Sequence, residues 1–225
     1  MKKVIHPRPE VNQVLINKFK DMEQVLSLSC VVGDAQERNQ IMRSDMKPRS
    51  VNKKIIGPAF TVKLTPGDLI DYLEVFNHIQ EGDVLVVDAF GETETSVLGG
   101  LMCGLCKAAG VAGIIVDGSV RDTDEARMLD VPVISKSVSP RSTHSPGSQR
   151  TEPFEFNTTI VCGGVVVKPG DLIVGDEIGV TVVPHDDLEE VYIKAKNQAA
   201  VEEAARNEIL KGKTADELLA QFGRL

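Results

Sequence analysis

The chain has 225 residues, of which 42% are hydrophobic and only 4% aromatic, and its formal net charge is -8. This composition excludes a disordered chain and predicts a soluble globular protein that needs no disulfides or metals to hold its core together. It also argues against nucleic-acid binding, because no basic run exceeds Lys53-Lys54. No stretch approaches ~18 apolar residues, so we expect no membrane span.

The four cysteines (Cys30, Cys103, Cys106 and Cys162) are scattered, and no apolar segment follows the basic N-terminus as it would in a signal peptide. We therefore predict reduced thiols and a cytoplasmic protein. Cys103 and Cys106 form a C-x-x-C motif, which occurs in redox and zinc sites. No second pair and no nearby His supports zinc, so apolar packing inside a helix is the favoured interpretation.

Helical and strand patterns alternate along the chain. Helical spacing of apolar residues indicates a helix within residues 10–30, and the polar segment 31–56 is expected to be a loop or lid. The expected strands are 59–64, 84–88, 114–117, 131–134, 160–162 with 165–167, and 172–174. Further helices are expected over 96–109, 124–129 and about 188–211, and a surface loop over 135–158. The sequence therefore predicts an α/β fold.

The segment 84–117 reads as a strand, a helix and a second strand, which is the signature of a βαβ unit. The rest of the pattern shows no linker or low-complexity segment. We therefore predict that residues 1–225 form a single domain with a long C-terminal helix.

Residues that could bind an anion follow the strands of this βαβ unit. Gly99 and Gly100 precede its helix, while Arg121-Asp122 and Glu125 follow its second strand. In open α/β sheets, ligands gather at this end of the strands. A helix start favours a carboxylate, an Arg fork suits a carboxylate or a developing enolate oxygen, and Asp is a hard ligand for Mg²⁺ or Mn²⁺. The pattern predicts a carboxylate site with a divalent cation.

This arrangement resembles the RraA-like family, which includes 4-hydroxy-4-methyl-2-oxoglutarate aldolases. The family pattern is Gly or Asp, twenty residues, Arg-Asp, two residues, then Glu or Asp. Here twenty residues separate Gly100 from Arg121, and two separate Asp122 from Glu125. The resemblance covers most of residues 55–185. It includes the turns Pro66-Gly67-Asp68 and Gly82-Asp83-Val84, and the segment from Val161-Cys162-Gly163-Gly164 through Gly170-Asp171.

The resemblance implies a layered β/β/α swivelling-type fold and a class II, metal-dependent pyruvate aldolase. A pyruvate enolate also forms when oxaloacetate loses CO₂, so decarboxylase activity is expected too. The implied catalytic residues are Arg121, Asp122 and Glu125. The implied cofactor is Mg²⁺, Mn²⁺ or another divalent cation held by Asp122. A small 2-oxo acid would be bound by Arg121 and by the backbone of Gly99, Gly100, Leu101 and Met102.

By the same resemblance the assembly is a homotrimer or a homohexamer with sites between subunits. Glu202 matches an acidic residue that family members supply from the C-terminal helix of a neighbouring subunit. One departure concerns proton transfer: the best-defined aldolases carry Asp where this chain has Gly100, and Gly100 cannot act as an acid or base. Some relatives instead bind ribonuclease E without catalysis, so a non-catalytic regulator is the alternative function.

Each site residue also has a simpler interpretation. Arg121-Asp122 is an exposed ion pair if it has no ligand, and such pairs contribute little. The two glycines then serve only close packing of helix on sheet. Glu125 and Glu202 are then solvated helix residues. For Glu202 this is the favoured interpretation. Asp117, at the end of its strand, either orders water beside the site or caps a turn.

Overall fold

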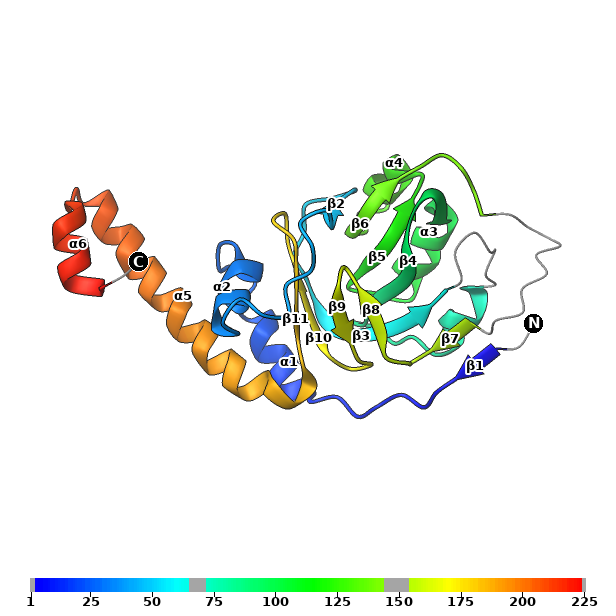
Figure 1. Cartoon of the computed structure of the whole chain (residues 1–225), viewed down its shortest axis with the longest axis horizontal. Coiled ribbons are helices and arrows are strands. Elements are labelled where there is room, and N and C mark those ends of the chain that lie inside the picture. The colour runs from blue at the N-terminus through cyan, green and yellow to red at the C-terminus, as the bar shows by residue number, and fades with distance from the viewer. Residues whose placement is uncertain (1–2, 65–71, 144–153, 224–225) are drawn as a thin grey trace.

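A parallel sheet forms the centre of the computed structural model, which describes residues 3–64, 72–143 and 154–223 (Figure 1). Its neighbouring parallel strands are β3 (Ile55–Lys63), β4 (Val84–Leu98), β5 (Gly113–Val120) and β6 (Val133–Val138). Short strands extend it at both edges: β7 (Phe154–Phe156) and β1 (Lys3–Ile5) beyond β3, and β2 (Lys47–Pro48) beyond β6.

A second layer of strands lies on one face of this sheet. Its strands are β8 (Ile160–Cys162), β9 (Val165–Val167), β10 (Leu172–Gly175) and β11 (Val180–Val183). Strand β3 joins the layers, because its first residues pair antiparallel with β10 while 59–63 pair parallel with β4. β8 and β9 form a separate antiparallel hairpin.

Helices cover the two outer faces. The face of β4–β6 that is turned away from the second strand layer is covered by η1 (Tyr72–Asn77), α3 (Gly100–Ala108) and α4 (Thr123–Met128). Over β10 and β11 lie α1 (Gln13–Lys20), α2 (Leu28–Ala35) and α5 (Leu188–Leu210), which η2 (His185–Asp187) precedes and α6 (Ala215–Phe222) follows. None of the described helices combines the length and the apolar content that a bilayer span requires.

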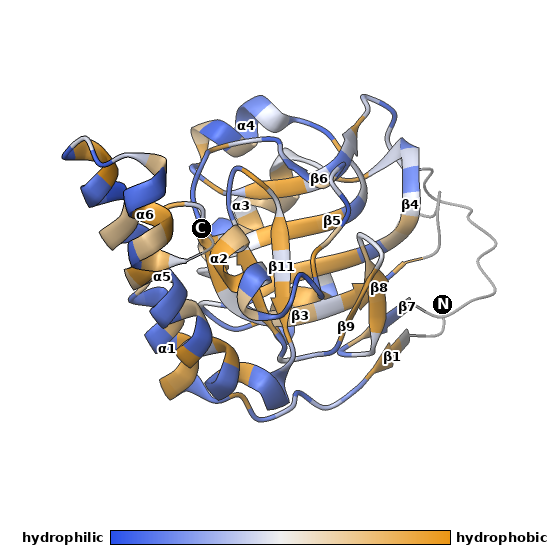
Figure 2. Cartoon of the chain, turned by 60° about the vertical axis from the view of Figure 1, so that its left-hand side comes forward, coloured by the Kyte–Doolittle hydropathy of each residue, from blue (hydrophilic) through white to orange (hydrophobic). Residues whose placement is uncertain are grey.

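Side-chain alternation along the strands separates the apolar clusters. Val87 and Val116 pack toward α3, whereas Val86 and Ile115 pack toward the second strand layer. The outer face of β10 and β11 packs in the same way against α1, α2 and α5. The apolar strands stand out in Figure 2. Strands buried on both faces explain the unbroken Val and Ile runs of the sequence.

The predicted α/β class, the βαβ unit and the long C-terminal helix are confirmed, but several boundaries were wrong. The strand expected over 84–88 continues to Leu98, because Ser96 and Leu98 pair with β5, so α3 begins only at Gly100. The helix expected within 10–30 is interrupted: α1 ends at Lys20, and Ser27 adopts a positive φ of 49° before α2.

The expected loop 31–56 contains most of α2, all of β2 and the start of β3. The expected loop 135–158 contains the end of β6 and all of β7. Strand β11 and helix α6 were not predicted. The Pro66-Gly67-Asp68 turn lies outside the described residues.

We predict that Ile115→Ala lowers the free energy of unfolding by about 2–5 kcal/mol, because Ile115 is fully buried and its truncation leaves a cavity. Urea unfolding followed by circular dichroism would measure this. Val14→Ala is the control: Val14 is 69% exposed on α1, so its truncation should change stability by less than about 0.5 kcal/mol. Equal losses in the two variants would contradict the core assignment.

Candidate active site

The predicted Arg-Asp pair lies where β5 passes into α4, beside the start of α3. The Arg121 amide donates to the carbonyl of Leu98 at 2.9 Å, which joins the ends of β5 and β4. Asp122 has a positive φ of 53°, and its carbonyl accepts from the Ala126 amide in the first turn of α4. The fold therefore brings the two predicted segments together, as expected for the carboxyl ends of parallel strands.

The Asp122 carboxylate links the loop to the helix. Its Oδ2 accepts from the Gly100 amide at 3.1 Å and lies 3.3 Å from Arg121 Nε. In this structure the Gly100 amide, which belongs to the segment predicted to bind a substrate carboxylate, instead donates to the Asp122 carboxylate. The amides of Leu101 and Met102, the next in the first turn of α3, bind no acceptor in the described part of the chain.

Both glycines allow close approach, and neither supplies an unusual backbone angle at this site. Gly99 has an extended backbone (φ -136°), and a Cβ on it would lie 2.6 Å from Asp122 Oδ2. A Cβ on Gly100 would lie 1.8 Å from Glu125 Oε2. The glycines therefore permit close packing, but of side chains from the β5–α4 segment and not of the sheet. What packs against them is two carboxylates, Asp122 and Glu125.

The pair remains open to a ligand. The side chains of Arg121 and Asp122 are 41% and 40% exposed, and only Nε of the guanidinium contacts Asp122. The two terminal guanidinium nitrogens form no hydrogen bond with any described residue. A single exposed contact of this kind contributes little to stability. The arrangement leaves a guanidinium fork and one carboxylate oxygen for other partners.

A divalent cation fits this chemistry as a sparsely coordinated ion. Among the described residues, no group of three or more His, Cys, Asp or Glu side chains could hold a metal. If a cation binds here, Asp122 would hold it, with Glu125 close by, and water or substrate would complete the coordination. Mg²⁺ is commonly bound through one or two carboxylates in this way.

Glu202 is not part of this cluster. Its carboxylate contacts Gln198 (3.1 Å) and Arg206 (2.5 Å) of its own helix. Helix α5 packs on α1 and α2, and Figure 1 shows it away from α3 and α4. Within one chain, Glu202 therefore lies apart from Arg121.

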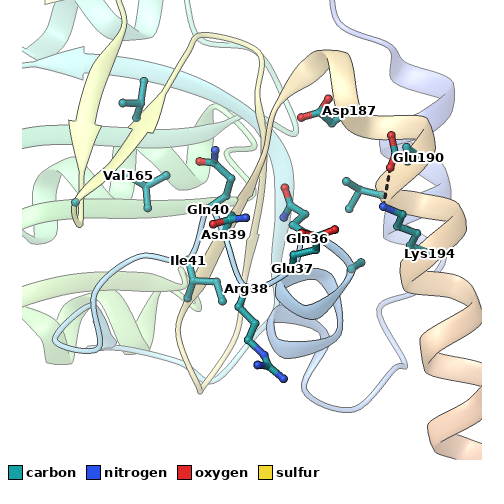
Figure 3. Close-up of a pocket in the computed structure, with 14 residues that line it drawn as sticks. Gln36, Glu37, Arg38, Asn39, Gln40, Ile41, Val165, Asp187, Glu190 and Lys194 are labelled. Atoms are coloured by element: carbon teal, nitrogen blue, oxygen red, sulfur yellow. Dashed lines mark ion pairs between the residues drawn. The ribbon is translucent and has the colours of Figure 1, made fainter.

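The sequence reasoning missed a second charged group. Lys63, Asp88 and Lys136 lie with Asp117 on four neighbouring strands, β3 to β6, and line a cavity of about 450 Å³. A signal was present, since the predicted strands 84–88 and 114–117 both end in an aspartate, and Lys63 directly precedes the last residue of the predicted strand 59–64. A different cavity, of about 770 Å³, lies between the loop after α2, β9 and α5 (Figure 3). The Glu190–Lys194 ion pair (2.6 Å) lies at its edge, and Glu37, Arg38 and Gln40 beside it have positive φ.

Residues 29–182 match the model of the Aldolase/RraA family, described as RraA-like. The chain belongs to this family. It is 37% identical over 178 residues to a Halalkalibacterium halodurans protein named "Putative 4-hydroxy-4-methyl-2-oxoglutarate aldolase", covering 79% of this chain and 82% of that protein. It is 34% identical over 177 residues to an uncharacterized Methanocaldococcus jannaschii protein, covering 77% and 82% respectively.

A solved structure shares the fold of this Aldolase/RraA member. Streptomyces coelicolor RraAS2, described as an unusual member of the RNase ES inhibitor RraA protein family, superposes with a TM-score of 0.74 at 29% identity. The match covers 88% of this chain and 100% of RraAS2. The resemblance inferred from the Gly100–Arg121 spacing is therefore confirmed at the level of family and fold.

We predict opposite effects of two Gly→Ala changes near α3. Gly99→Ala should lower stability, because its Cβ displaces Asp122 from the Gly100 amide. Gly104→Ala should raise the free energy of unfolding by about 0.5–1 kcal/mol, since its Cβ meets only Leu129 Cδ1 at 4.0 Å within the helix. Urea unfolding of both variants measures this, and stabilisation by Gly99→Ala would contradict the close approach of Asp122.

We also predict that only one thiol per chain reacts rapidly with Ellman's reagent at pH 8. Cys30 is exposed, whereas Cys103, Cys106 and Cys162 are buried. Burial raises the pKa of Cys103 to about 11, so only about one thiol in a thousand is ionised at pH 8. Burial also raises the pKa of Cys106 and Cys162. All four should react in guanidinium chloride, and a fast Cys103–Cys106 pair would restore the redox interpretation.

Proposed function

We propose that this chain is a divalent-metal-dependent lyase acting on pyruvate-type 2-oxo acids. The reactions would be cleavage of 4-hydroxy-4-methyl-2-oxoglutarate-like substrates, decarboxylation of oxaloacetate, or both. The observation that carries the proposal is the grouping of Arg121, Asp122 and Glu125 around Gly99 and Gly100, with the terminal guanidinium nitrogens of Arg121 bound to none of the described residues. Family membership and the name of the 37% identical relative support the same chemistry.

The residues of the chain have separate tasks in this proposal. The free amides of Leu101 and Met102 would bind the substrate carboxylate at the positive end of α3. The Arg121 fork would donate to the 2-oxo oxygen and stabilise its negative charge as the C–C bond breaks. Asp122 would hold Mg²⁺ or Mn²⁺, which when bound would supply Lewis-acid stabilisation of negative charge.

The two reactions differ in their need for a base. In decarboxylation, the electrons of the breaking C–C bond pass into the enolate. No hydroxyl group has to lose a proton in this step. Retro-aldol cleavage must also remove the proton of the 4-hydroxyl group. Gly100 cannot do this, but Glu125 Oε2 fills the space that a side chain at position 100 would occupy. We therefore propose Glu125 as the proton acceptor for the aldol reaction.

The proposed assembly is a homotrimer or homohexamer. In it, α5 of a neighbouring subunit would bring Glu202 to the Arg121 site, because a single chain keeps the two apart. A second function, binding and inhibition of an RNase E-type ribonuclease, is supported by the 29% identity to RraAS2. The open fork of Arg121 favours the enzyme, since a purely protein-binding surface does not require it.

We predict pyruvate release from oxaloacetate with Mg²⁺ and its loss with EDTA. Asp122→Asn and Arg121→Lys should each lower kcat/KM by about 10²–10³-fold, because each removes stabilisation of the developing charge. Glu125→Gln should lower aldol cleavage by at least about 10²-fold and decarboxylation much less. A coupled lactate dehydrogenase assay measures both reactions.

Asp124→Asn is the matched control for these variants, since Asp124 is an exposed carboxylate in the same first turn of α4. It should leave both activities unchanged. If the wild-type protein turns over neither substrate with Mg²⁺ or Mn²⁺, the lyase proposal fails. Tight binding to an RNase E-type enzyme would then support the regulator.

A further inference from the structure

A row of charged side chains crosses the four parallel strands of the central sheet. Lys63 of β3 pairs in register with Asp88 of β4, and Asp88 pairs with Asp117 of β5. Lys136 lies on β6, the next parallel strand. Four consecutive strands therefore each contribute one charge, in the order plus, minus, minus, plus.

This row lies on the opposite face of the sheet from α3. Because side chains alternate along a strand, Asp88 and Asp117 project on the same face as Val86 and Ile115, which pack toward the β8–β9 hairpin. Val87 and Val116, on the other face, pack with α3. The row and the hairpin enclose a cavity of about 450 Å³, which we name the sheet pocket. Its lining includes none of residues 99–102 or 121–125.

One carboxylate oxygen of Asp117 has no hydrogen-bond donor among the described residues. Asp117 is only 6% exposed, and its Oδ2 accepts from the Gly163 amide at 2.9 Å. Its Oδ1 is buried and is the oxygen to which no described residue donates. The nearest cation, Lys136 Nζ, lies 4.0 Å away, beyond hydrogen-bonding distance. Burying a carboxylate oxygen without a hydrogen-bond donor costs free energy. A ligand that donates a hydrogen bond to Asp117 Oδ1 is therefore favoured.

Asp88 differs, because its carboxylate is already used by the backbone. It accepts from the amides of Phe90 (2.9 Å) and Val161 (3.4 Å), and burial raises its pKa. These bonds fix the Phe90-Gly91 turn, in which both residues have positive φ (56° and 71°). A Cβ on Gly91 would lie 2.7 Å from Lys136 Nζ, so this turn covers the pocket closely.

The cations of the sheet pocket remain available. Lys63 Nζ lies 5.9 Å from the centre of the Phe90 ring, and neither Lys63 nor Arg43 forms a side-chain hydrogen bond or ion pair with a described residue. Lys136 has only its distant contact with Asp117. Three cations against two carboxylates make this a locally positive cavity in a protein of net charge -8. Such a site selects anions.

We propose that the sheet pocket binds a small hydroxycarboxylate anion. Its carboxylate groups contact Lys63, Lys136 and Arg43, and its hydroxyl donates to Asp117 Oδ1. The carbon chain lies against the apolar wall formed by Phe90, Val161 and Val166. The proposal is independent of the lyase function, since the two groups of residues share no member.

Isothermal titration calorimetry with L-malate and succinate tests this, because the two dicarboxylates differ only by a hydroxyl group. The full chain carrying Arg121→Ala is titrated, so that binding at the lyase site is removed. We expect L-malate to bind at least about tenfold more tightly than succinate, as a hydrogen bond to a charged group provides. Asp117→Asn should reduce this preference to within about threefold.

Lys63→Met with Lys136→Met should weaken both ligands by at least about tenfold, while Lys53→Met, on the surface outside the pocket, should change neither. Circular dichroism melting of each variant shows whether it is folded, and Lys63→Met alone serves if the double variant is not. Equal binding of malate and succinate, binding unaffected by the pocket substitutions, or no binding at millimolar concentration would each overturn the proposal.

Discussion

The parallel pairing of β3, β4, β5 and β6 is the constraint on which both charged sites depend. Parallel pairing requires a crossover between strands, so residues distant in sequence meet at one edge of the sheet. Asp88 and Asp117 are neighbours because their strands align residue by residue. Beyond Asp88 the register of β4 against β5 shifts at several irregular steps, and these place Val120 beside Leu98, so that Arg121 lies next to the start of α3.

The sequence was sufficient for features governed by local spacing. The apolar runs predicted the central strands, and the distance from Gly100 to Arg121 indicated the site. It was insufficient where long-range pairing decides the backbone: residues 92–96 are polar, and they belong to β4 because β5 lies beside them. Likewise, nothing near Gly100 in sequence indicates that its amide is bound by Asp122, twenty-two residues later.

The local charge at the two proposed sites differs from the net charge of the whole chain. An acidic protein repels anionic metabolites at long range, yet Arg43, Lys63 and Lys136 line one cavity beside the parallel sheet, and the Arg121 guanidinium is 41% exposed. Elsewhere, cations such as Lys194 and Arg206 are neutralised by carboxylates one helical turn away. Local field therefore outweighs global charge in deciding which small molecules can bind.

The absence of a side chain at Gly99 matters when this chain is compared with its relatives. Because a methyl group there would lie 2.6 Å from Asp122 Oδ2, the carboxylate can approach the first turn of α3 only above a glycine. A homologous chain that keeps the Arg-Asp dipeptide but has a bulkier residue in this position must hold its acid differently. The glycine is thus a criterion, as informative as the charged pair, for deciding which relatives share this chemistry.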